Sequence, residues 1–180
     1  ALLNRLPNGA RRMLRVLTVS ALFIMLSFFL FQPFADWYAL GYTKINVWEG
    51  SHTPVTSYLT HWGLFLFLIV AWMARESLEW MAETPVSALR SLRPHIFWIQ
   101  FALVVLIASI LILLWMEVHI AWLVLPLAAW AGVLLVKPNL SDAKRVVLFI
   151  VGTGLVLTLM VEVIVLVGDI GRMNTVFKFY

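Results

Sequence analysis

The chain has 180 residues, of which 63% are apolar and 12% charged, and its mean hydropathy is +0.96. These values exclude a water-soluble globular domain and a disordered segment, because neither class carries so much apolar surface. The absence of cysteine excludes disulfides and thiolate metal sites. The net charge of +4 does not indicate a nucleic-acid partner, since the basic residues are spread over the connections between apolar stretches.

Five apolar stretches are long enough to cross a lipid bilayer as helices. A hydrocarbon core about 30 Å thick requires roughly 20 residues of helix. The stretches also lack the polar and apolar alternation of β-barrel strands. We therefore predict an all-α, polytopic integral membrane protein with a single transmembrane domain over residues 1–180. The five predicted transmembrane helices are residues 14–31, 58–73, 96–115, 120–136 and 146–167.

The distribution of Lys and Arg predicts the orientation of the chain. Only three of the 13 basic residues fall on one side of the predicted spans, at Lys44, Arg172 and Lys178. Basic residues accumulate in cytoplasmic connections, so we predict a cytoplasmic N-terminus and a C-terminus outside, in a multi-pass protein of the cytoplasmic (inner) membrane. The ten residues on the predicted cytoplasmic side are Arg5, Arg11, Arg12, Arg15, Arg75, Arg90, Arg93, Lys137, Lys144 and Arg145.

The predicted outer loop, residues 32–57, mixes aromatic rings with carboxylates and amides. Asp36, Trp37 and Tyr38 open this loop. Rings that cover apolar C–H faces beside polar groups suit the recognition of sugars or lipid headgroups. The alternative is a loop that rests on the bilayer interface, where Trp and Tyr are enriched in any case.

Glu162 is the one ionisable residue well inside a predicted span. A carboxylate at that depth is costly, so it must face protein or a water-filled cleft. Two interpretations remain open: a functional carboxylate, or a group that hydrogen-bonds to Thr or His on a neighbouring helix and fixes packing. Asp169 follows seven residues later, two helical turns on, and is therefore expected on the same helix face.

Two histidines lie close to the predicted outer boundary, His61 and His119. Histidine at this depth can ligate haem or a chlorophyll-type magnesium, or it can act as an interfacial hydrogen-bonding group. No cluster of His, Asp and Glu has metal-ligand spacing. The sequence therefore predicts no metal site and leaves any cofactor unassigned.

Two local features predict how helices end and pack. Pro138, Asn139 and Ser141 are typical of a turn followed by a helix N-cap, which restarts the chain into the last span. Trp130 lies deeper than the other tryptophans and is expected to pack against a neighbouring helix.

Residues 168–180 (GDIGRMNTVFKFY) resemble the signature of the Chlor_Arch_YYY membrane protein family. Residues 32–34 (QPF) and 61–67 (HWGLFLF) resemble the preceding segments of that family in the same order. The family has no assigned function, and its members are longer polytopic proteins likened to the GT-C glycosyltransferases, which transfer sugar from a lipid-linked donor at the outer face. The resemblance implies that this chain is part of a longer protein and is not catalytic alone.

The same resemblance implies roles for individual residues. In a transferase, Arg172 and Lys178 would hold a donor phosphate. An acid or base, or a metal ligand, would come from the carboxylates. The candidate catalytic residues are Asp36, Glu162 and Asp169, and the candidate substrate-binding residues are Arg172, Asn174, Lys178, Trp37 and Tyr38.

The sequence also supports a different class of function. In that alternative Arg172 pairs with Asp169, and the terminal aromatic residues anchor at the interface. The chain is then a non-catalytic structural or accessory subunit of a larger membrane complex, photosynthetic or respiratory. Its partners are the lipid bilayer together with other membrane chains or the remainder of a longer chain.

Overall fold

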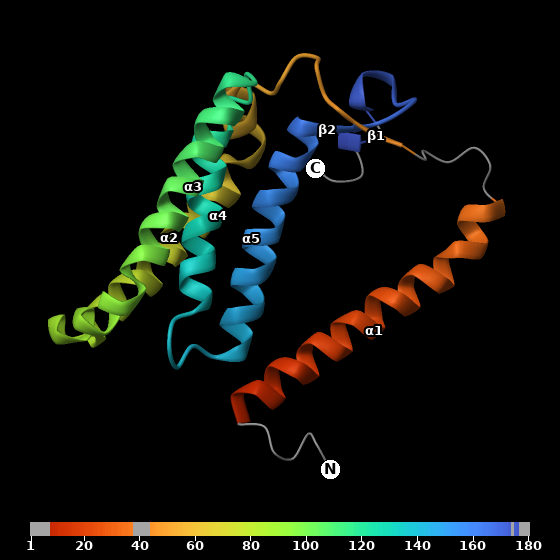
Figure 1. Ribbon diagram of the computed structural model, residues 1–180. Coiled ribbons are helices and arrows are strands. Elements are labelled where there is room, and N and C mark those ends of the chain that lie inside the picture. Colours follow the sequence, from red (N-terminus) through yellow and green to blue (C-terminus); the bar gives the residue numbers. More distant parts are fainter. Residues whose placement is uncertain (1–7, 38–43, 174, 177–180) are drawn as a thin grey trace, which may run out of the picture. The chain divides into compact units, whose positions relative to one another are not determined.

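The computed structural model describes residues 8–37, 44–173 and 175–176, and Figure 1 shows its elements in chain order. Contacts divide the chain into two compact units, Ala1–Thr43 and Lys44–Tyr180. In the described part of the first unit there is one helix, α1 (Asn8–Trp37). It contains the apolar stretch Val16–Phe34, which confirms that the first predicted span is helical.

The second unit is built from four apolar helices. They are α2 (Val55–Glu83), α3 (Ile96–Trp115), α4 (Ala121–Leu135) and α5 (Asp142–Val163). A ten-residue 3-10 helix, η2 (Val86–His95), connects α2 to α3. Helix α4 packs against α2, α3 and α5 and lies between α3 and α5 in Figure 1.

Small side chains let α4 approach its neighbours. Ala121, Val124 and Ala131 of α4 are fully buried, and Ala131 faces Gly152 of α5, where a Cβ would lie 3.8 Å from the alanine Cβ. Close backbone approach increases the dispersion contacts that hold membrane helices together, since lipid tails compete for any merely apolar surface. Trp130 packs against the cluster that contains Met73 of α2, as predicted.

Four helices in the described residues are long and apolar enough to cross a membrane, namely α1, α2, α3 and α5. The fourth predicted span forms α4, which has 15 residues, or about 22 Å of helix rise, and is therefore shorter than a hydrocarbon core of about 30 Å. The chain is therefore a helical membrane protein, and its described residues form four apolar helices of membrane length and one shorter apolar helix. Ser141 is the N-cap of α5 and accepts a hydrogen bond from the Lys144 backbone N–H, which confirms the predicted cap.

The prediction that the last span continues to residue 167 is wrong. Helix α5 ends at Val163, and Ile164–Leu166 forms strand β2, which pairs antiparallel with β1 (Ile45–Val47). The run VIVLV at residues 163–167 is rich in β-branched side chains, which favour a strand once a partner strand is present. The described chain is thus not purely α-helical, and β1 lies within the segment predicted as the outer loop.

Candidate functional site

Glu162 lies in the last turn of α5 and is completely buried. Its Oε2 accepts a hydrogen bond from the Thr53 backbone N–H at 2.9 Å, and its Oε1 accepts one from the Thr53 hydroxyl at 2.6 Å. Arg172 Nη1 lies 3.0 Å from Oε2. A buried carboxylate is tolerated when donors and an opposite charge surround it in this way. Glu162 therefore joins the segment before α2 to the segment after α5.

Arg172 is the cation of this site and is itself buried. Its Nη1 donates to the Val161 carbonyl oxygen at 2.9 Å, and its Nη2 donates to the Thr53 hydroxyl at 3.2 Å. The guanidinium carbon lies 5.3 Å from the centroid of the Trp48 ring, within the range of a cation–π contact. The planar fork of arginine directs its N–H groups at separate acceptors in fixed directions, a geometry that the ammonium group of lysine lacks.

The backbone at Gly171 and Arg172 is left-handed. This conformation turns the Arg172 side chain back toward the last turn of α5. Gly171 has φ of +57°, and Arg172 itself has φ of +55°. A left-handed non-glycine residue costs about 1–2 kcal/mol. The contacts of the guanidinium with Glu162, Thr53 and Trp48 offset that strain.

His52 completes the site from the segment before α2. Its side chain is 7% exposed, and its Nδ1 lies 3.5 Å from Glu162 Oε2 without meeting hydrogen-bond geometry. We call the group of Trp48, His52, Thr53, Glu162 and Arg172 the latch. His52 and Thr53 lie within the predicted outer loop but were not among the predicted site residues, although a polar pair directly before Pro54 and a long apolar helix is a signal that could have found them.

Asp169 does not share a helix face with Glu162, and that prediction is wrong because the helix ends at Val163. Asp169 Oδ2 accepts hydrogen bonds from the Thr175 backbone N–H at 2.7 Å and from its hydroxyl at 2.6 Å. Thr175 is buried. The carboxylate thus orders the turn that carries Arg172, and among the described ion pairs the partner of Arg172 is Glu162.

The other candidate residues belong to the first unit or lie outside the described residues. Asp36 is an exposed residue in the last turn of α1, and the backbone of Trp37 ends that helix; both belong to the first unit. Tyr38, Asn174 and Lys178 lie outside the described residues. Of the eight candidate catalytic and substrate-binding residues, the structure brings Glu162 and Arg172 into contact.

The two candidate cofactor histidines are exposed. His61 Nδ1 lies 2.9 Å from the Ser57 carbonyl oxygen, one helical turn before it. Among the residues described, no group of three or more His, Asp or Glu side chains is arranged to hold a metal ion. His61 therefore has the local hydrogen bond expected of an interfacial histidine.

Comparison with known proteins gives the family. The profile of DUF2298, described as uncharacterized membrane protein, matches residues 2–180. The chain belongs to the DUF2298 family. No curated protein and no solved structure matches it.

A second buried charged cluster in this DUF2298 protein lies at the opposite end of α2. Glu76 is 2% exposed; Lys144 Nζ contacts its Oε1, and Lys137 Nζ lies 3.6 Å from its Oε2. We call Glu76, Lys137 and Lys144 the lysine cluster. Glu76 was not predicted as a buried charge, because the predicted span stops at residue 73, whereas α2 continues to Glu83.

Arg145 acts beside the lysine cluster as a helix cap in this DUF2298 protein. Its guanidinium donates to the carbonyl oxygens of Leu135 at 2.8 Å, Lys137 at 3.2 Å and Leu140 at 3.3 Å. The last carbonyls of a helix have no intrahelical partner and favour a cation. Arg145 therefore fixes the end of α4 and the turn into α5, a role beyond that of a marker of membrane orientation.

Proposed function

We propose that this DUF2298 chain is a non-catalytic, membrane-spanning structural part of a larger membrane protein assembly. The observation that carries the proposal is the saturation of Glu162 by Thr53 and Arg172 in a fully buried position. A catalytic acid or base must reach the proton that it transfers. A carboxylate closed off by its own chain instead fixes the geometry of the segments that it joins.

The lysine cluster supports the same proposal from the other end of the unit. There too, a buried carboxylate is held between cations that come from separate segments, and Arg145 satisfies the end of α4. Buried ion pairs thus link the helices at each end of the bundle, where the helices meet their connecting segments. Such buried ion pairs are suited to holding helices in a fixed arrangement, because a protein loses much stability when one partner of a buried pair is absent.

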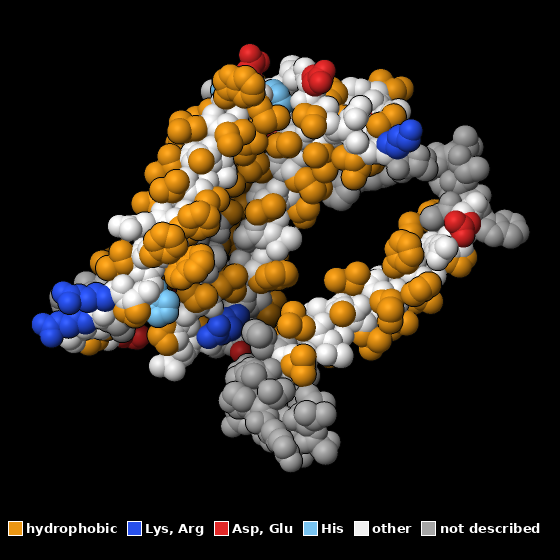
Figure 2. All heavy atoms as spheres, viewed as in Figure 1, with side chains coloured by type: hydrophobic (Ala, Val, Ile, Leu, Met, Phe, Trp, Pro, Cys, Tyr) orange, Lys and Arg blue, Asp and Glu red, His pale blue; other side chains and the backbone are white. Residues whose placement is uncertain are grey.

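We further propose that the latch lies at the outer face of the cytoplasmic membrane, with the N-terminus of the chain inside and its C-terminus outside. In the second unit, Lys and Arg gather at the end where α2 meets η2 and where α4 turns into α5 (Figure 2). Positively charged connections favour the cytoplasmic side. The latch lies at the opposite end of the same helices, since α2 begins and α5 ends there.

A second candidate function is a YYY-type, GT-C-like transferase that acts on a lipid-linked sugar at the outer face. It rests on the resemblance of residues 168–180 and on one further observation. A pocket of about 470 Å³ beside the latch is lined by residues 46–50 and Val165, including Asn46, Trp48 and Glu49. An indole ring beside an amide and a carboxylate is a combination that suits sugars. In this alternative the latch positions that pocket, and the catalytic acid comes from another part of the protein.

Thermal unfolding of the purified protein in detergent tests the first proposal. We expect Glu162→Gln and Arg172→Gln each to lower the unfolding free energy by about 3–5 kcal/mol, because each leaves a buried charge without its partner. The double variant should be less destabilised than the sum of the two single variants. A polyprenyl-phosphate sugar added to the wild-type protein should leave its unfolding temperature unchanged.

Stabilisation by the polyprenyl-phosphate sugar would favour the transferase. Because the latch only positions the pocket in that alternative, Glu162→Gln should destabilise the protein under either proposal, and the added sugar separates the two. The wild-type protein would gain stability from the polyprenyl-phosphate sugar through ligand linkage, and the variant would lose that gain.

A further inference from the structure

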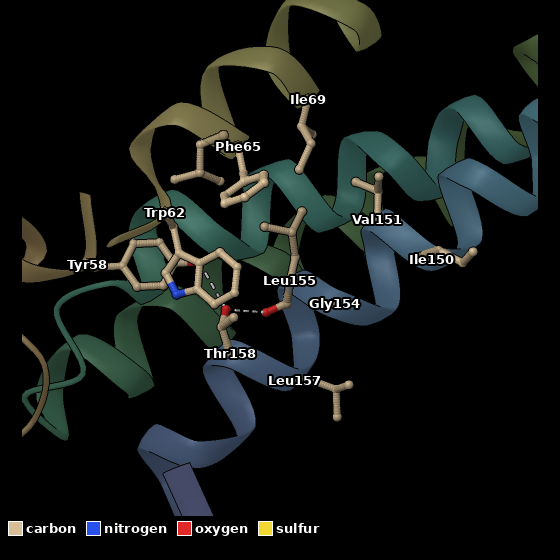
Figure 3. A pocket seen from close by; sticks show the side chains of 11 residues that line it. Tyr58, Trp62, Phe65, Ile69, Ile150, Val151, Gly154, Leu155, Leu157 and Thr158 are labelled. Carbon is tan, nitrogen blue, oxygen red and sulfur yellow. Dashed lines mark hydrogen bonds between the residues drawn. The ribbon is translucent and has the colours of Figure 1, made fainter. Parts of the chain in front are cut away.

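A half-open pocket of about 280 Å³ lies between α2 and α5, below the latch. Figure 3 shows its lining side chains, with Tyr58 and Thr158 at one end and Ile69 and Val151 toward the other. We call this pocket the α2–α5 groove. Along α2 it runs from residue 58 to residue 69, which is about 16 Å of helix rise. That length is about half of a hydrocarbon core.

The groove exists because α2 and α5 both pack against α4. Behind it, Leu66 and Leu155 belong to a buried cluster that includes Val124 of α4. Gly154 contributes no side chain to the wall, and a Cβ placed there would meet nothing within 4 Å. The gap therefore has a packed floor and an open space at Gly154.

The two hydroxyl groups at the upper end of the groove are bonded to each other. Thr158 Oγ1 donates to the Leu155 carbonyl oxygen at 2.8 Å. The Tyr58 hydroxyl, 3.0 Å away, is therefore placed to donate to Thr158 Oγ1. The rest of the wall is aromatic and aliphatic, including Trp62 and Ile69. The wall of the groove therefore offers a bound molecule mainly apolar contacts.

These properties select the occupant. A water molecule in a cavity needs two to four polar partners, and away from the Tyr58 and Thr158 hydroxyl groups, which already bond to each other, the wall is mainly apolar. An empty groove would forfeit the dispersion contacts of its lining atoms. Both walls are helices of membrane length, so the surrounding medium at this depth is lipid hydrocarbon.

We propose that the α2–α5 groove binds one acyl chain of a bilayer phospholipid. The chain lies along α2 against Trp62 and Ile69 and passes over Gly154. The inference does not depend on the proposed function, since a structural part and a transferase would both retain such a lipid.

Native mass spectrometry of the purified protein tests this proposal. We expect wild type to retain one phospholipid per chain after detergent exchange. Gly154→Leu places a side chain in the groove and should remove most of that lipid, at least fivefold in bound fraction. Gly63→Leu is the matched control: Gly63 lies on α2, a Cβ there also meets nothing within 4 Å, and it does not line the groove. This control should retain the lipid as wild type does.

The same measurement can overturn the proposal. Equal retention in wild type and Gly154→Leu would place the lipid elsewhere, and a wild-type chain without retained lipid would mean that the groove holds none tightly. A retained polyprenyl phosphate in place of a phospholipid would contradict the acyl-chain assignment.

Photocrosslinking keeps the test decisive even where Gly154→Leu fails to fold. Wild-type protein is reconstituted with phosphatidylethanolamine that carries a diazirine at the end of one acyl chain. Labelled peptides should come from residues 58–69 of α2 and 150–158 of α5 at several times the level found on α3, whose side chains are not buried. Uniform labelling of the three helices would reject a specific groove.

Discussion

Thr53 and Glu162 are 109 positions apart in the chain, yet the backbone N–H and the hydroxyl of Thr53 both donate to the Glu162 carboxylate. This pair brings the residue that precedes Pro54 and α2 into contact with the last turn of α5. Arg172 then closes the latch by donating to the Thr53 hydroxyl and pairing with Glu162. The relationship explains how a charged residue at the end of an apolar helix is accommodated.

The Thr53 hydroxyl should contribute measurably to stability. Thr53→Val removes a donor to Glu162 and an acceptor for Arg172, so we expect the unfolding free energy to fall by about 1–3 kcal/mol. Thr53→Ser keeps the hydroxyl and should stay close to wild type. Denaturant or thermal unfolding in detergent measures both. Thr60→Val is the control, because its hydroxyl bonds to Thr56 of its own helix at an exposed position; an equal loss there would argue against the latch.

Loss of the Glu76 carboxylate should destabilise the lysine cluster. Glu76→Gln leaves Lys137, which is 7% exposed, without an opposite charge, and we expect a loss of about 3–5 kcal/mol in unfolding free energy. Glu79→Gln is the matched control, since Glu79 pairs with Arg75 on the exposed side of the same helix. An exposed pair of this kind contributes little. Similar unfolding temperatures for the two variants would contradict the structural role of Glu76.

The hydrogen bonds of Arg145 can be tested separately from its positive charge. Arg145→Lys preserves the positive charge and hence the orientation signal, but a lysine cannot reach the carbonyl groups of Leu135, Lys137 and Leu140 together. We expect a loss of at least about 1 kcal/mol in stability, with unchanged insertion. Unfolding and protease protection measure the two quantities. If Arg145→Lys were as stable as wild type, Arg145 would serve only as an orientation signal.

The proposed orientation can be tested by labelling single cysteines, because these 180 residues contain none. Ser51, before α2, and Ser87, in η2, are both exposed. With the C-terminus outside, Ser51→Cys should react with a membrane-impermeant maleimide in intact cells, and Ser87→Cys should react only after the membrane is permeabilised. Labelling of Ser87→Cys alone would invert the orientation, and labelling of both in intact cells would mean that α2 does not cross.

The sequence by itself determined the membrane character and the approximate positions of the helices. Apolar length is a local property that adds up along the chain, so α1, α2, α3 and α5 are visible without any knowledge of contacts. The Ser141 cap was predictable for the same reason, since its hydrogen bond reaches only to Lys144.

Only the tertiary structure decided how the polar residues are used. The end of α5 at Val163 depends on a strand that begins at Ile45, and the partners of Glu162 depend on contacts across more than 100 residues with Thr53. A periodicity argument extends a helix until a breaker appears, and the run after Val163 contains none before Gly168. Strand pairing and buried charge neutralisation are long-range terms, and the free energy that they contribute is absent from any local window of sequence.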